Sequence, residues 1–295
     1  MKTTIITLVG LFLGALSSLA AAAEPCQAEP LSILLTNDDG YDTIGIVALH
    51  RALKNAGHHV KRIAPERNYS GSSTSLTLDL IKAPQVADTE FSEVFAVTGS
   101  PATSVLLGAS AIFTPEKPAQ LVISGINDGA NLGPATPISG TVGATIAAIK
   151  VLNPPLPAIA ISTNMPAGDS GREKLAHVAN VADFVKRLLD RLQCAQTRWS
   201  DTDMALNVNY PPLEPASIKG VRLASQGRSA YFRIGFTATG DGHFVPSFGA
   251  AETTEDAPSA DTVLFNAGYV TVVPVDGDYT AADATLPAGL EAIAP

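Results

Sequence analysis

Basic residues are scarce in this 295-residue chain, and they do not cluster. There are 19 lysines and arginines against 28 aspartates and glutamates, which gives a formal net charge of −9. Proteins that bind nucleic acid through phosphate contacts carry basic patches, so this balance argues against general nucleic-acid binding. The sequence also lacks a G-x-S-x-G nucleophile elbow and a G-x-x-x-x-G-K-[ST] loop. These absences argue against a serine hydrolase of that type and against a P-loop NTPase.

Other shortages exclude further classes of protein. Charged residues make up 16% of the chain and aromatic residues 6%, whereas 46% of it is hydrophobic. This apolar content is enough for a packed core, so the chain is neither disordered nor collagen-like nor a coiled coil. One large α/β domain and two smaller domains are both consistent with its length.

The first 23 residues have the three parts of a secretory signal. Lys2 precedes the apolar stretch ITLVGLFLGAL, and the small-residue run ALSSLAAAA follows. We predict cleavage near Ala23, export to the periplasm or out of the cell, and no stable membrane association of the mature chain. The alternative is an uncleaved membrane anchor, but the apolar stretch is short for a span, and no later stretch is long and apolar enough to provide one.

The chain has only two cysteines, Cys26 and Cys194, and neither has the spacing of a metal ligand. In an oxidising compartment such a pair can form a disulfide. A disulfide and two free thiols are equal alternatives at this point, because bonding requires the two Cα atoms to lie within about 7 Å of each other.

From residue 31 onward, short apolar runs alternate with helical patterns. Strands are predicted at 31–36, 60–65, 93–99, 120–125 and 157–163. The first run, LSILLT, is apolar without interruption, as expected of a strand buried on both faces. A helical stripe follows it and stops at Gly57, and further helices are predicted near 101–112, 140–152 and 174–192. This alternation predicts an α/β fold with a doubly wound, mostly parallel sheet.

Beyond residue 195 the helical patterns give way to β-like runs. These runs are ALNVNY, KGVRLAS and AGYVTVVPV, separated by loops rich in proline and glycine. We therefore predict a signal peptide at 1–23, an α/β core at 24–195 and a smaller β-rich C-terminal subdomain at 196–295.

Two adjacent carboxylates, Asp38 and Asp39, directly follow the first predicted strand. The carboxyl ends of strands line the binding crevice of an open α/β sheet, so these side chains are expected to face a ligand. Neighbouring carboxylates raise each other's proton affinity unless a cation neutralises them, which favours a hard divalent metal. The alternative is a turn in which Asp39 caps the following helix.

Three further segments, each expected at the end of a strand, are rich in small polar residues: 65–73, 124–133 and 139–142. Their glycines expose backbone N–H groups. A helix that begins after Ser139, Gly140 and Thr141 would direct its positive end at an anion. Oxygen ligands for a metal beside donors for an anion indicate a site for a phosphate ester.

These motifs in this order resemble the SurE family of metal-dependent 5'/3'-nucleotidases and acid phosphatases. The motifs are ILLTNDDG, APERNYSGSS, VTGSP, ISGINDGANLG and SGTV, followed by NVNYPP, QGR and GYVTVVP, and they span about residues 31–275. The resemblance implies a Rossmann-like core, a C-terminal extension that exchanges between subunits, and a homodimer or homotetramer. It also implies hydrolysis of nucleoside 5'/3'-monophosphates and other small phosphate esters.

The resemblance further implies roles for particular residues. One divalent cation per subunit, Mg²⁺ or Mn²⁺, would be held by Asp38, Asp39, Ser70 and Asn127. The substrate phosphate would lie near Asn131, Ser139, Gly140 and Thr141. In catalysis Asp38 would either take the proton of an attacking water or attack phosphorus itself.

The alternative to an enzyme is an exported binding protein, or a catalytically silent relative, that holds a phosphorylated ligand without hydrolysing it. Departures from the family pattern at 42–45 and 99–104 are compatible with this alternative. Retention of both aspartates favours the enzyme.

Overall fold

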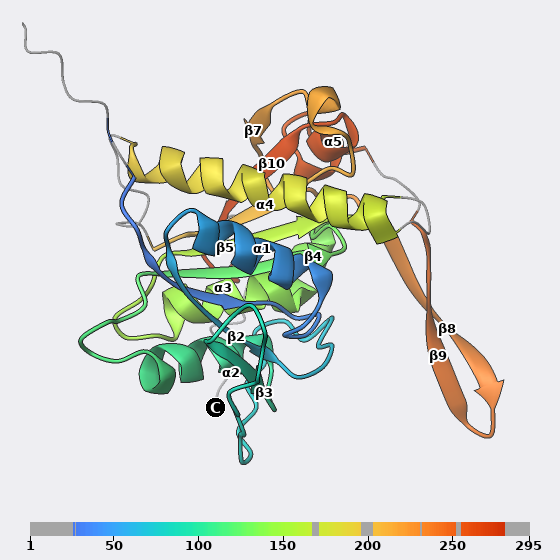
Figure 1. Ribbon diagram of the computed structural model, residues 1–295. Helices are drawn as coiled ribbons and strands as arrows, with labels where there is room; N and C mark the ends of the chain where they lie inside the picture. The colour runs from blue at the N-terminus through green and yellow to red at the C-terminus, as the bar shows by residue number, and fades with distance from the viewer. Residues whose placement is uncertain are drawn as a thin grey trace, which may run out of the picture.

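The computed structural model describes residues 26, 28–166, 171–195, 203–230, 232–251 and 255–280. The signal peptide expected at 1–23 lies outside these residues. A single eight-stranded sheet in the order β3-β2-β1-β4-β5-β6-β10-β7 forms the centre of the molecule (Figure 1). Its strands are β1 (Ser32–Thr36), β2 (His59–Pro65), β3 (Val94–Val97), β4 (Leu121–Asp128), β5 (Ala158–Thr163), β6 (Ala205–Tyr210), β7 (Val221–Leu223) and β10 (Val270–Val275).

Helices cover both faces of this sheet, as the predicted doubly wound fold requires. They are α1 (Ile44–Asn55), α2 (Pro101–Leu107), α3 (Gly140–Lys150), α4 (Gly171–Gln193) and the short α5 (Asp261–Asn266). Apolar residues of α1 and α4 pack in one buried cluster and those of α2 and α3 in another. Figure 1 shows the two pairs on opposite sides of the strands. None of the helices among the described residues has both the length and the hydropathy to cross a membrane.

The uninterrupted apolar run of β1 is explained by burial on both faces. Ile33 and Leu35 belong to the cluster beneath α1 and α4, whereas Leu34 belongs to the cluster beneath α2 and α3. Successive side chains of a strand point to opposite faces, so both faces need apolar residues here. Helix α1 ends where predicted, since Gly57 follows it with a φ of 92° that few other residues adopt.

Three strands of the C-terminal third join the central sheet, and two form a small sheet of their own. Strand β10 pairs antiparallel with β6, and β7 pairs with β10, so these strands extend the central sheet across the expected division at residue 195. The separate part is an antiparallel hairpin of β8 (Phe232–Gly240) and β9 (His243–Ala250), which projects from the body of the molecule (Figure 1).

This hairpin was missed in the sequence, although its turn is a recognisable signal. Asp241 and Gly242 connect the strands with φ values of 51° and 77°. Two positive φ angles in an Asp-Gly pair are typical of the tight turn that joins two antiparallel strands.

Cys26 and Cys194 form a disulfide, which decides between the two alternatives for this pair. Their Cα atoms are 5.7 Å apart, and 168 residues separate them in sequence. The bond ties the N-terminal segment before β1 to the end of α4.

Candidate active site

The predicted site residues lie near the point where the strand order of the sheet reverses. Strand β1 lies between β2 and β4, and the chain continues through β2 and β3 on one side and through β4, β5 and β6 on the other. Helices connected to neighbouring strands therefore lie on opposite faces, and a crevice opens between them at the carboxyl ends of the strands. Asp38 and Asp39 follow β1, and Asn127 lies near the end of β4.

The turn after β1 is held by Asn37, the first residue of the motif that contains both aspartates. The Nδ2 of Asn37 donates to the carbonyl of Gly40 at 2.9 Å, and its Oδ1 accepts from the N–H of Gly40 at 3.2 Å. Helix α1 has Thr43 at its N-cap. The alternative in which Asp39 caps this helix is therefore wrong, and both aspartates are left for other contacts.

Asp38 is buried against the start of α3. Its side chain is 3% exposed, and its Oδ1 accepts a hydrogen bond from the hydroxyl of Thr141 at 2.5 Å. Burial raises the pKa of Asp38, while the Thr141 hydroxyl and the backbone N–H groups of Thr141 and Gly140 oppose the rise. The positive end of α3 is thus directed at this carboxylate. A Cβ atom at Gly140 would lie 2.9 Å from Oδ2 of Asp38, so the close approach requires glycine.

Asp39 occupies the other side of the same turn. Its Oδ2 accepts from the N–H of Asp128 at 3.0 Å, and it lines a neighbouring cavity of about 440 Å³ together with Asp42. Burial, together with the charges of Asp38 and Asp128, raises the pKa of Asp39 to about 7. A buried and a half-buried carboxylate in adjacent positions oppose each other's ionisation, and a bound cation relieves this repulsion.

Five of the eight predicted residues line one cleft of about 520 Å³: Asp38, Ser70, Asn127, Asn131 and Ser139. The other three do not. Asp39 faces the neighbouring cavity, and Gly140 and Thr141 lie behind Asp38. The Thr141 hydroxyl is bonded to Asp38, so its observed contact is with the carboxylate.

Hydrogen bonds to the backbone fix the orientation of two polar side chains in the cleft. The Nδ2 of Asn127 donates to the carbonyl of Gly129 at 2.6 Å, which fixes the orientation of the amide and turns its Oδ1 away from that carbonyl. Ser139 is the N-cap of α3, where its Oγ accepts from the N–H of Val142 at 3.2 Å. The hydroxyl hydrogen of Ser139 remains able to donate to an anion.

A buried polar network behind the cleft was also missed in the sequence. The N–H of Asn131 donates to Asn209 at 2.7 Å, its carbonyl accepts from Asn207 at 2.9 Å, and its Nδ2 donates to Ser162 at 2.8 Å. These partners lie on β5 and β6, so Asn131 is anchored to the sheet. The signal was the presence of two asparagines in the otherwise apolar run ALNVNY.

Asp261 anchors the adjoining part of the loop. It is fully buried, and it accepts from the N–H groups of Gly133 at 3.1 Å and Gly227 at 2.9 Å. Burial raises the pKa of Asp261 and these hydrogen bonds oppose the rise. The carboxylate thus joins the loop after β4 to the segment Gln226–Arg228.

The donor set fits a hard divalent cation. The described residues contain no group of three or more histidine, cysteine, aspartate or glutamate side chains arranged for a metal. The candidate ligands are instead two carboxylates, a hydroxyl and an amide oxygen. All are oxygen atoms, which Mg²⁺ and Mn²⁺ prefer to nitrogen or sulfur.

The fold and the cleft define a doubly wound α/β protein with paired carboxylates and hydroxyl donors at its switch point. The family model "Survival protein SurE" matches residues 33–233. A 5'/3'-nucleotidase SurE from Photorhabdus laumondii is 36% identical over 253 residues, which cover 85% of this chain and 92% of that protein. A 5'-nucleotidase SurE from Aquifex aeolicus is 39% identical over 203 residues, which cover 68% and 73%.

The crystal structure of the SurE protein from Aquifex aeolicus superposes with a TM-score of 0.66 at 33% sequence identity, covering 89% of this chain and 98% of that one. The chain belongs to the SurE family.

Proposed function

We propose that the chain is an exported phosphomonoesterase that requires a divalent metal and hydrolyses nucleoside 5'- and 3'-monophosphates and other small phosphate esters. The observation that carries the proposal is the position of Asp38, a buried carboxylate at the switch point that shares a cleft with Asn127 and Ser139. The printed names of the relatives, 5'/3'-nucleotidase and 5'-nucleotidase, support the same activity.

The metal would be one Mg²⁺ or Mn²⁺ per subunit, held by Asp38, Asp39, Ser70 and Asn127. When bound, a divalent cation neutralises charge on the phosphate and orients the ester. Burial raises the pKa of both aspartates, and for Asp39 the charge of Asp38 adds to the rise, which supports this assignment.

Protein groups would carry the remaining steps. The Thr141 hydroxyl holds Asp38 in place, so that this carboxylate either accepts the proton of an attacking water or attacks phosphorus directly. Ser139 would donate its hydroxyl hydrogen to a phosphate oxygen, and Asn131 would complete the phosphate-binding surface, with Gly140 and Thr141 behind Asp38. Hydrolysis forms a bond between phosphorus and the oxygen of water and breaks the bond between phosphorus and the ester oxygen. The proton released by the water passes to the departing alcohol.

Residues 1–23 would direct export and be removed, and the mature chain would act in the periplasm or outside the cell. The disulfide between Cys26 and Cys194 supports this location, because disulfides persist in oxidising compartments. Analysis of the N-terminus of the protein recovered from the producing cells tests cleavage near Ala23.

The C-terminal hairpin would join subunits into a homodimer or homotetramer. The outer half of the hairpin exposes Phe244 by 63% on one face and Val245 by 48% on the other, and exposed apolar side chains mark interaction surfaces. Light scattering of the mature protein tests this part, and a monomer at all concentrations contradicts it.

Phosphate release tests the activity itself. The mature protein is assayed with 5'- and 3'-nucleotides, with EDTA present and after addition of Mg²⁺ or Mn²⁺. We expect activity that EDTA abolishes and metal restores. Asp38→Asn is expected to lower kcat at least about a thousandfold while the circular dichroism spectrum stays unchanged. Folded wild-type protein that binds nucleotides but releases no phosphate with any cation would instead be the silent binding protein.

A further inference from the structure

The candidate cleft has two walls of opposite character. One wall carries the site residues, among them Asp38, Asn127 and Ser139. The other is formed by the hairpin β8–β9, which contributes Phe232, Ile234, Phe236, Pro246 and Phe248. The proposed function uses only the first wall and leaves the second without a role.

The five hairpin residues lie on one face of the hairpin. Ile234 pairs with Phe248, and Phe236 pairs with Pro246. Directly paired residues share a face, and residues two apart on a strand share it as well. The opposite face carries smaller or polar residues such as Thr237 and Ser247. The apolar wall is therefore set by the alternation of the sequence and not by a chance gathering of side chains.

Two aromatic rings on this wall lack cover from the rest of the chain. Phe236 is 71% exposed and Phe248 is 70% exposed, although both line the cleft. Phe248 also meets Phe232 edge to face, with ring centroids 5.8 Å apart. Exposed aromatic faces beside a polar site suit a flat ring carried by the same ligand as the polar group.

The size of the cleft points the same way. A volume of about 520 Å³ lies within the range of pockets for small organic ligands. A phosphate group would need only the polar wall, with its hydroxyl and carboxylate neighbours. The apolar wall is left for the organic part of the ester.

We propose that the apolar face of the hairpin, formed by Phe232, Ile234, Phe236, Pro246 and Phe248, binds the aromatic ring of the substrate's leaving group, a nucleobase or an aryl ring. The inference rests on the proposed function, which supplies the phosphate end of the same ligand. None of these five side chains can donate or accept a hydrogen bond at the wall. The hairpin thus recognises the face of a ring and not the identity of a base.

The test compares an ester that has a ring with one that does not. Phosphate release from adenosine 5'-monophosphate and from glycerol 3-phosphate is measured with Mn²⁺ for Phe248→Ala, Phe236→Ala and the wild type. We expect KM for the nucleotide to rise about tenfold in both variants, because loss of base stacking on an aromatic side chain has about this effect. Values for glycerol phosphate, and kcat for both esters, are expected to stay within about twofold.

Phe244→Ala is the matched control. Phe244 pairs with Ala238 on the same face of the hairpin and is exposed, but it does not line the cleft. Its ratio of KM values for the two esters should equal that of the wild type, even where subunit association changes. Equal effects of Phe244→Ala and Phe248→Ala on the ratio and on the mass in solution would overturn the inference and make this face a packing surface between copies.

Failure of the proposed function is recognised separately. Wild-type protein that hydrolyses neither ester contradicts the enzyme, and equilibrium dialysis with adenosine 5'-monophosphate then replaces turnover. Weaker nucleotide binding by Phe248→Ala than by Phe244→Ala supports the aromatic wall even then. Equal binding by these two variants and the wild type, or equal KM changes for both esters, refutes it.

Discussion

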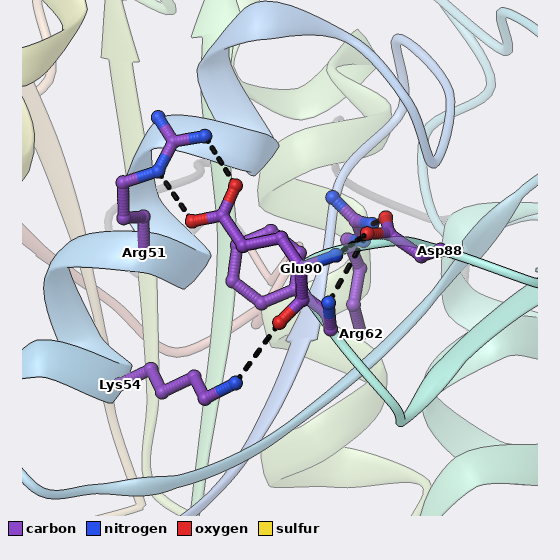
Figure 2. A network of polar contacts seen from close by, with 6 residues as sticks. Arg51, Lys54, Arg62, Asp88 and Glu90 are labelled. Atoms are coloured by element: carbon purple, nitrogen blue, oxygen red, sulfur yellow. Dashed lines mark hydrogen bonds and ion pairs between the residues drawn. The ribbon is translucent and has the colours of Figure 1, made fainter.

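The ion pair between Arg62 and Asp88 offers a sharp test of how this fold is stabilised. The side chain of Arg62 on β2 is 1% exposed, and its Nη2 lies 2.6 Å from Oδ2 of Asp88, whose side chain is 24% exposed (Figure 2). The Nε and Nη1 atoms of Arg62 have no hydrogen-bond partner among the described residues. The guanidinium also lies over the ring of Phe91 at 5.1 Å. Asp88 is therefore the main compensation for a buried positive charge.

Asp88→Asn removes the negative charge and keeps the shape of the side chain. The backbone N–H groups of Glu90 and Phe91, which now donate to Oδ1 of Asp88 at 2.8 and 3.1 Å, keep an acceptor in the amide. The amide nitrogen of the new side chain cannot accept from Arg62. Removing one partner of a buried ion pair lowers the free energy of unfolding by about 3–5 kcal/mol. Because Asp88 is partly exposed, we expect a loss at the lower end, about 3 kcal/mol.

The same network supplies a matched control, Glu90→Gln. Glu90 pairs with Arg51 through two hydrogen bonds, but the two side chains are 41% and 49% exposed. Surface pairs of this kind contribute less than about 1 kcal/mol. The two substitutions thus each remove one carboxylate charge from neighbouring positions and differ mainly in the burial of the cation that is left behind (Figure 2).

The assay is thermal unfolding followed by circular dichroism at pH 7 and at one protein concentration. A loss of about 3 kcal/mol corresponds to a fall in Tm of about 6–12 °C for a chain of this size. If Asp88→Asn destabilises the protein no more than Glu90→Gln does, burial of Arg62 does not determine the strength of the pair, and the reasoning is refuted.

The pH dependence of the stability difference between the wild type and Asp88→Asn gives a second check. Burial by itself raises the pKa of Asp88, but hydrogen bonds from the N–H groups of Glu90 and Phe91 and the charge of Arg62 outweigh it, so the net pKa lies below the ordinary 3.8. A carboxylate with a lowered pKa stabilises the folded state fully above its unfolded pKa and loses this contribution as pH falls through its folded pKa. The gap between wild type and Asp88→Asn should therefore be constant near pH 7 and shrink below pH 3.8.

Two further predictions concern the site and the disulfide. Thr141→Val removes the hydroxyl that holds Asp38 and should lower kcat about tenfold to a hundredfold, because hydrogen bonds to charged groups contribute about 1.5–3 kcal/mol. Thr141→Ser keeps a hydroxyl and should retain most of the activity. An unchanged kcat in Thr141→Val would contradict the positioning role. Cys194→Ser opens the loop of 168 residues closed by the disulfide and should lower the free energy of unfolding, measured by urea titration, by about 2–5 kcal/mol. The reduced wild type should be as stable as this variant. A variant as stable as the oxidised protein would contradict the prediction.

The fold of the core was readable from local pattern. The apolar run at 31–36 and the polar Asn37–Gly40 that follows it predicted a buried strand and a turn, and β1 and its turn lie there. Run ALNVNY corresponds to β6 residue for residue. Parallel strands covered on both faces must be apolar throughout, and such runs are visible without knowledge of the partners.

Which strands pair with each other could not be predicted from the sequence. Three β-like runs after residue 195 predicted a small β-rich subdomain. These runs, β6, β7 and β10, join the central sheet, and the small separate unit is the hairpin of β8 and β9. Hydrogen bonding between strands depends on which edge is free when the chain returns, and no local pattern encodes this. The role of Thr141 was hidden for the same reason, because its contact with Asp38 joins positions 103 residues apart.

The sequence by itself determined the α/β class, the acidic turn at Asp38 and Asp39 and the polar loops at strand ends, since each follows from the residues within a few positions. Only the tertiary structure decided that Cys26 reaches Cys194, that the start of α3 is directed at Asp38, and that an apolar hairpin face lines one wall of the cleft. These are contacts between distant segments, and their geometry is set by the packing of the whole sheet.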